Sequence, residues 1–167
     1  ARPDLEVVLF RGNVDTRLGK VAAGEVDATF LALAGLIRLG RDDVGATPIG
    51  ADEMLPAVCQ GIVGIERRAD DDRVAALLAP LNDTETANRA AAERTLLAGL
   101  DGSCRTPIAA LADITGNDMH FRAAIVRPDG SELIETERRG AVTDAAAMGN
   151  DAADELRGKA GKGFFDE

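Results

Sequence analysis

The sequence predicts an α/β region at the beginning of the chain, followed by a small α+β domain with an antiparallel sheet covered by helices. Two patterns carry this prediction. Between residues 5 and 34, two short apolar runs flank a helical stretch, and strand, helix and strand at this spacing indicate a βαβ unit with a parallel sheet. Between residues 108 and 139, three segments alternate or nearly alternate between apolar and polar side chains, which is typical of antiparallel strands.

The βαβ unit is expected to begin with a buried strand over residues 5–10, an apolar run rich in β-forming residues. Asn13 or Asp15 is placed to cap the helix that follows, and Gly24 is placed to end it. A second buried strand is expected over residues 28–34.

The middle of the chain is expected to hold short elements. One helical turn between glycines is expected over residues 35–40, and the composition of residues 41–52 indicates a polar loop. Residues 62–66 are a further candidate strand. Residues 71–81 place apolar side chains three and four positions apart, which predicts an amphipathic helix.

The last part of the chain changes in pattern near Asp83, which is placed to cap the longest helix, ending at Gly99. Asp129 and Gly130 form a strong hairpin signal between two of the expected strands. A final helix follows after the third strand. The expected strands and this helix cover residues 108–114, 119–126, 132–139 and 144–156.

Composition and charge disfavour several kinds of partner. The 167 residues carry a formal net charge of −10, which opposes nonspecific binding to nucleic acid or to an anionic membrane. No apolar run approaches the about 20 residues that span a bilayer, and no secretory leader is expected. The two cysteines do not lie at metal-ligand spacing from the single histidine, so neither a metal site nor a disulfide framework is expected. We therefore expect a soluble, cytoplasmic protein.

Three arginines follow expected strands of the α/β region. Arg11 and Arg17 lie where the first strand turns into the helix, and Arg38 follows the second strand. Ligands of open α/β sheets bind at this edge, and guanidinium groups suit a carboxylate or a phosphate. Single arginines are most often solvated surface residues. Three that converge on one edge favour an anion site.

Cys104 is the candidate reactive residue. A lone cysteine is most often a small buried apolar group. Cys104, however, lies in a polar, glycine-rich loop between a long helix and a strand, and the neighbouring Arg105 would favour its thiolate. Cys59 has apolar neighbours and is expected to be inert.

Four stretches in register resemble the porphobilinogen deaminase family. Cys59 and Ser103 stand where the family pattern has glycine. The stretches, with the family patterns they resemble, are residues 11–18 (RGN-x-x-TRL), 33–40 (A-A-G-L-x-R-L-G), 55–61 (L-P-A-V-G-Q-G), and 93–94 with 102–108 (E-R…G-G-C-x-x-P-I).

The resemblance implies a three-domain fold, in which two α/β domains resemble the halves of a periplasmic binding protein. Residues 1–54 would be the rear part of the second domain, and residues 55–82 would cross back to complete the first. Residues 83–167 would form the α+β domain that carries the cofactor cysteine. This last boundary agrees with the change of pattern near Asp83.

The resemblance also implies a function: a transferase of tetrapyrrole (porphyrin, heme) biosynthesis that condenses four porphobilinogen molecules into hydroxymethylbilane and releases ammonia. A dipyrromethane primer would be bound to Cys104 through a thioether. Arg17 and Gln60 would contact this cofactor, and Arg11 and Arg38 would hold the carboxylates of the substrate.

The family's catalytic aspartate would lie upstream of Ala1, so no catalytic residue is expected within the chain. Alone, the chain is expected to be inactive unless the N-terminal part of the same protein accompanies it as a separate piece. The resemblance further suggests a monomer.

The residues leave two other interpretations open. One is a non-catalytic α/β module that binds a carboxylate or phosphate and leaves Cys104 idle, and the other is a structural or regulatory segment without a ligand. The state of Cys104 separates these from the enzyme, because a thioether, unlike an exchangeable thiol, resists reducing agents.

Overall fold

The computed structural model describes residues 4–103 and 105–166. The chain divides into two compact units, Ala1–Pro48 and Ile49–Glu167. Every helix within the described residues is too short or too polar to span a bilayer.

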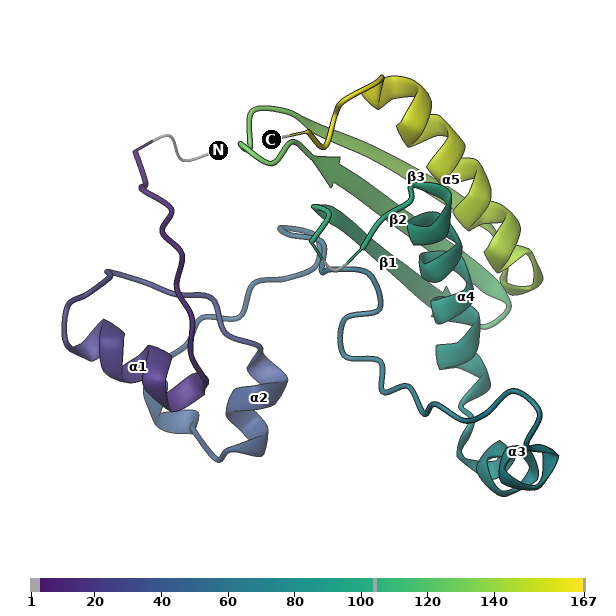
Figure 1. Ribbon diagram of the computed structural model, residues 1–167, viewed down its shortest axis with the longest axis horizontal. Coiled ribbons are helices and arrows are strands. Elements are labelled where there is room, and N and C mark those ends of the chain that lie inside the picture. Colours follow the sequence, from purple (N-terminus) through teal and green to yellow (C-terminus); the bar gives the residue numbers. More distant parts are fainter. Residues whose placement is uncertain (1–3, 104, 167) are drawn as a thin grey trace. The chain divides into compact units, whose positions relative to one another are not determined.

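The second unit is built on a three-stranded antiparallel sheet in the order β1 (Ile108–Thr115), β2 (Asp118–Val126) and β3 (Leu133–Ala141). Helices α4 (Thr84–Gly99) and α5 (Ala145–Ala160) pack against one face of this sheet (Figure 1). Alternate side chains of the central strand point into the core between sheet and helices. They are Met119, Phe121, Ala123 and Ile125. The predicted α+β arrangement is therefore confirmed for this part of the chain.

Local signals fix the ends of these elements. The Asp83 carboxylate accepts a hydrogen bond from the Thr86 amide at 2.7 Å, so it caps α4 as predicted. The hairpin between β2 and β3 turns at Gly130, whose φ of +73° lies in the left-handed region. The Asp129 carboxylate accepts from both the amide and the hydroxyl of Ser131, which confirms the predicted turn.

Helices α4 and α5 approach closely at Gly149. A Cβ atom at this position would lie only 2.3 Å from the backbone oxygen of Ala92 on α4. Glycine is therefore needed here for helix–helix contact, although it weakens an isolated helix.

Within the second unit, the segment before α4 differs in part from expectation. Helix α3 (Asp72–Leu78) and the 3₁₀ turn η2 (Ala79–Leu81) confirm the helix predicted over residues 71–81. The strand predicted over residues 62–66 is not formed, and Val63 is 83% exposed. A strand needs a hydrogen-bonding neighbour, and the described chain supplies none at this segment.

The first unit holds helices α1 (Val14–Ala22) and α2 (Leu33–Arg38) and a 3₁₀ turn, η1 (Asp42–Val44). Asn13, one of the two predicted caps, accepts from the Thr16 amide at 2.8 Å. The helical turn expected over residues 35–40 overlaps α2, which begins two residues earlier and ends at Arg38.

The parallel sheet predicted for the first unit is not formed. The described residues of this unit contain no strand, and the last two residues of the run 28–34 belong to α2. Val7 and Leu9 are 95% and 81% exposed. The apolar runs have the composition of strands, but without paired neighbours their backbone groups have no ladder to join.

Candidate functional site

Arg11 lies at the entry to α1. The preceding strand is absent, but the turn into the helix is tightly built. Gly12 has a φ of +138°, and a Cβ atom there would lie 2.8 Å from the Thr16 Cγ2 atom. Arg11 is exposed, and no carboxylate within the described residues pairs with it. Its guanidinium is therefore free to bind an anion.

Arg17 lies on α1 beside an aromatic ring. Its guanidinium carbon is 5.8 Å from the centroid of the Phe10 ring, and the Lys20 ammonium is 5.4 Å from the same centroid. The Arg17 Nε atom is buried and has no hydrogen-bond partner among the described residues. A buried donor without an acceptor is unfavourable, so this atom is suited to an incoming acceptor.

Arg38 is the last residue of α2 and is exposed, with no ion-pair partner in the described part of the chain. Three residues later, Arg41 bonds to Asp15 of α1, with Nη1 and Oδ1 2.5 Å apart, and also to Asp43. The hydrogen bond from Arg41 lowers the pKa of Asp43 below its ordinary value. Arg41 thus links the stretch 11–18 to the end of α2, a role that we did not predict.

In the second unit, the stretch 55–61 lies along the free edge of β1. Ala57 forms an antiparallel bridge with Ala109, and the Pro56 carbonyl accepts from the Ala110 amide at 3.0 Å. Gln60, three residues after the bridge, is exposed. The stretch that carries Gln60 therefore lies beside the beginning of β1. In the chain, β1 directly follows the loop that contains Cys104.

Glu93 of α4 joins these parts. Its side chain is buried, with the residue only 4% exposed. Oε2 accepts from the Cys59 amide at 2.6 Å and Oε1 accepts from the Ala112 amide at 3.1 Å. Burial raises the pKa of the Glu93 carboxyl above its ordinary value, although both amide donors act in the opposite direction.

The role of Glu93 was not predicted, although its place on the helix offers a signal. Glu93 lies beside Ala92 and three residues before Leu96, both of them fully buried. An acidic residue within the apolar face of a helix needs a partner, and here the partners are two backbone amides.

Cys104 itself lies outside the described residues, but the loop on either side of it is described. The Ser103 amide donates to the Thr106 hydroxyl at 3.0 Å, and the Thr106 amide donates to the Ser103 carbonyl at 3.0 Å. The Arg105 amide donates to the Ser103 hydroxyl at 3.2 Å. Ser103 and Arg105 are both exposed. These bonds join Ser103, Arg105 and Thr106 to one another near the surface.

Gly102 lies where this loop passes close to the apolar core. A Cβ atom there would lie 2.5 Å from the Ile108 Cδ1 atom and 2.7 Å from the Leu97 Cδ1 atom. The loop can therefore pass close to the apolar core only if this position has no side chain.

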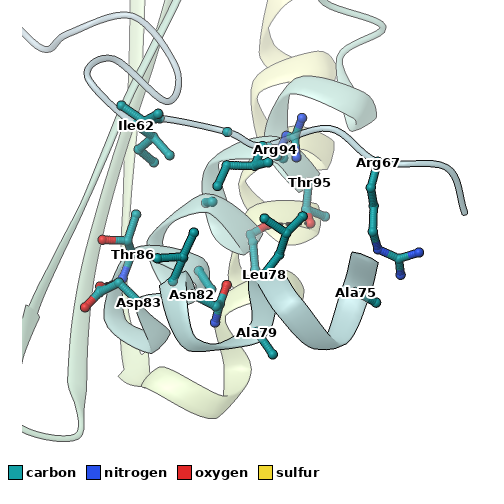
Figure 2. Close-up of a pocket in the computed structure, with 17 residues that line it drawn as sticks. Ile62, Arg67, Ala75, Leu78, Ala79, Asn82, Asp83, Thr86, Arg94 and Thr95 are labelled. Atoms are coloured by element: carbon teal, nitrogen blue, oxygen red, sulfur yellow. Dashed lines mark hydrogen bonds between the residues drawn. The ribbon is translucent and has the colours of Figure 1, made fainter. Parts of the chain in front are cut away.

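The second unit also has a cavity of about 680 Å³ away from these residues. Figure 2 shows that residues of α4, including Arg94 and Thr95, face residues of α3 and of the segment from Ile62 to Arg67 across this cavity. The Arg67 guanidinium is already bonded to backbone carbonyls at residues 68 and 69. Of the predicted site residues that the structure describes, none lines this cavity, and its walls are mainly alanine, leucine and isoleucine.

Two family models match nearly the whole chain. Residues 1–76 match the model described as "Porphobilinogen deaminase, dipyromethane cofactor binding domain", and residues 87–158 match "Porphobilinogen deaminase, C-terminal domain". The chain belongs to the porphobilinogen deaminase family. The resemblance found in the sequence is therefore confirmed.

Curated relatives agree with this assignment. The chain is similar to the porphobilinogen deaminase of Paracoccus denitrificans (strain Pd 1222), with 58% identity over 99% of this chain and 53% of the relative. It is also similar to the porphobilinogen deaminase of Nitrobacter hamburgensis (strain DSM 10229 / NCIMB 13809 / X14), with 55% identity over 98% of this chain and 52% of the relative. The chain spans about half the length of the curated relatives it matches.

The two departures from the porphobilinogen deaminase pattern differ in their structural effect. Cys59 has a φ of +57°, a left-handed conformation that favours the glycine of the family pattern. Ser103 does not have a positive φ; among the described residues of its loop, Asp101 is left-handed, with a φ of +52°. Burial, together with the nearby charge of Glu93, raises the pKa of the Cys59 thiol. Cys59 is therefore protonated at neutral pH and a weak nucleophile.

Proposed function

We propose that the protein carrying this chain is a transferase of tetrapyrrole biosynthesis, which condenses four porphobilinogen molecules into hydroxymethylbilane and releases four molecules of ammonia. The observation that carries this proposal is the match of two porphobilinogen deaminase models across residues 1–76 and 87–158. The same matches disfavour a non-catalytic anion-binding module. That the catalytic aspartate lies outside these 167 residues remains a prediction.

Arg11 and Arg38 bind the substrate in this proposal. Porphobilinogen carries an acetate and a propionate, and a guanidinium can bind a carboxylate through two parallel hydrogen bonds. The two arginines are exposed and have no carboxylate partner in the described chain, which supports this role. Arg17, whose Nε atom is buried without an acceptor among the described residues, binds carboxylates of the cofactor.

Cys104 holds a dipyrromethane cofactor in this proposal. The residues around it fit such a group, because the turn at Ser103 and Arg105 is exposed and the guanidinium of Arg105 favours a thiolate next to it. When bound, the dipyrromethane supplies the primer to which substrate units are joined. The Cys104 sulfur anchors it through a thioether bond, and Gln60 contributes polar contacts from the neighbouring stretch.

We also propose the finer fold expected from the resemblance, with residues 1–54 and 55–82 in α/β domains like those of periplasmic binding proteins and residues 83–167 as the α+β domain. The exposed β-forming segments 5–10 and 62–66 support this proposal, because each would gain hydrogen bonds by joining a larger sheet. A cytoplasmic location and a monomeric state complete the proposal.

The test is turnover by the full-length gene product that carries this sequence. We expect it to consume porphobilinogen and to release one ammonia for each molecule consumed. Replacing Arg38 by leucine should lower kcat/KM by about 10-fold to 100-fold, the effect of losing one charge-assisted hydrogen-bonded pair. The matched control is Arg73→Leu, which removes another exposed arginine from α3 and should leave kcat/KM unchanged. No turnover by a folded wild-type protein would refute the proposal.

A further inference from the structure

The free edge of β1 is covered by side chains of α4. The Ala112 amide donates to Glu93 and the Ala112 carbonyl accepts from the Arg89 Nη1 atom at 2.8 Å. Two residues earlier on β1, the Ala110 amide donates to the Pro56 carbonyl. The backbone groups of this edge are therefore satisfied partly by a helix and partly by the stretch 55–61.

Glu93 does more than cover this edge. Its second oxygen accepts from the Cys59 amide, so one carboxylate bonds two segments that lie 34 and 19 residues away in the sequence. A buried carboxylate is unfavourable unless its oxygens are hydrogen-bonded, and both oxygens are. Cys59 adopts a left-handed conformation, which is unfavourable for a residue with a side chain, and the bond from its amide to Glu93 helps to hold it there.

We propose that Glu93 is a positioning residue that fixes Gln60 relative to the loop carrying Cys104. Helix α4 and strand β1 are the two elements on either side of that loop, and Glu93 binds β1 at Ala112 from α4. Its other bond holds Cys59, the residue directly before Gln60. One side chain therefore sets the place of Gln60 relative to the helix and the strand on either side of the loop.

This inference rests on the proposed function, in which Gln60 contacts the cofactor. Glu93 touches neither substrate nor cofactor in this account and acts only through the backbone. A glutamine of the same size would keep one oxygen acceptor but turn its NH₂ group toward the other amide, so one of the two bonds would be lost.

The first measurement is amide hydrogen exchange in the full-length gene product with Glu93→Gln. We expect exchange to accelerate by about 10-fold in residues 57–61 or at Ala112, because one of the two hydrogen bonds that join residue 93 to these segments is lost. Exchange in β2 and β3 should stay unchanged. The matched control is Asp154→Asn, the same change from carboxylate to amide on an exposed residue of α5. Unchanged exchange both in residues 57–61 and at Ala112 of Glu93→Gln would overturn the inference.

The second measurement is a double-mutant cycle with Gln60→Ala, using the kcat/KM for porphobilinogen. We expect Glu93→Gln to lower kcat/KM by about 10-fold, and the double variant to be no worse than Gln60→Ala alone, because Glu93 acts through Gln60. Additive losses would overturn the inference. If Glu93→Gln does not fold, Glu93→Asp, which keeps both oxygens on a shorter side chain, takes its place in both measurements with the same expected results. Absence of turnover in the wild type would refute the proposed function, whereas the exchange result stands apart from activity.

Discussion

The contact between α4 and α5 at Gly149 offers a sharp test of the described packing. An alanine Cβ atom at this position would lie 2.3 Å from the Ala92 backbone oxygen and 3.0 Å from the Thr95 Cβ atom. Ordinary contact begins at 3.4 Å, so the two helices would have to separate by about 1.1 Å at this point. The obstructing atom belongs to the backbone and cannot be moved by a change of rotamer.

The expected magnitude follows from two opposing effects. Forcing a methyl group into a closely packed core costs about 1–3 kcal/mol. Replacing glycine by alanine within a helix returns up to about 1 kcal/mol. We therefore expect Gly149→Ala to lower the free energy of unfolding by about 1–2 kcal/mol.

The assay is urea unfolding of the full-length gene product, followed by circular dichroism. Gly158→Ala is the matched control, because Gly158 lies on the same helix with no atom within 4 Å of its added Cβ. This variant should raise the free energy of unfolding by about 0.5–1 kcal/mol through helix propensity alone. A Gly149→Ala variant as stable as the wild type would contradict the close approach of α4 and α5, and a destabilised control would contradict the assigned helix.

Three further predictions concern single residues. Asn13→Ala should remove the cap of α1, which costs about 1 kcal/mol, and should accelerate amide exchange in α1 by about 5-fold. Cys59→Val should be destabilising by about 2 kcal/mol, whereas Cys59→Gly should remain within about 1 kcal/mol of the wild type in urea unfolding, because only glycine adopts a positive φ without strain. Hydrogen bonds from Lys159, Thr136 and Arg138 lower the pKa of Glu155 to about 2. Its ionised form therefore stabilises the folded chain above its ordinary pKa of 4.5, and this contribution is lost as the pH falls toward 2. Glu155→Gln should flatten the dependence of stability on pH in that window.

The elements that the sequence predicted well are those with local signals. The cap at Asp83 and the apolar spacing of its helix placed α4 to within one residue at its end. The turn at Gly130 and the alternation on both sides placed β2 and β3. Each of these features depends on residues a few positions apart, so the sequence contains most of the information that determines them.

The strands expected over residues 5–10 and 62–66 are not formed, because a strand depends on a neighbour that lies far away in the sequence. Their composition favours a strand, but the partner is a separate segment that composition cannot identify. The role of Glu93 was missed for the same reason, since the amides of Cys59 and Ala112 that it binds are far from it in the sequence. The left-handed conformation of Cys59 had one sequence signal, the glycine at this position in the family pattern.

The central claim is that Cys104 anchors a dipyrromethane cofactor, and the most direct measurement is the intact mass of the full-length gene product under denaturing and reducing conditions. We expect an excess equal to two porphobilinogen molecules less two ammonia molecules, because each C–S or C–C bond formed releases one ammonia. This excess should disappear in Cys104→Ala and persist in Cys59→Ala. The bare polypeptide mass in a protein that turns over porphobilinogen, or an excess that survives Cys104→Ala, would contradict the claim.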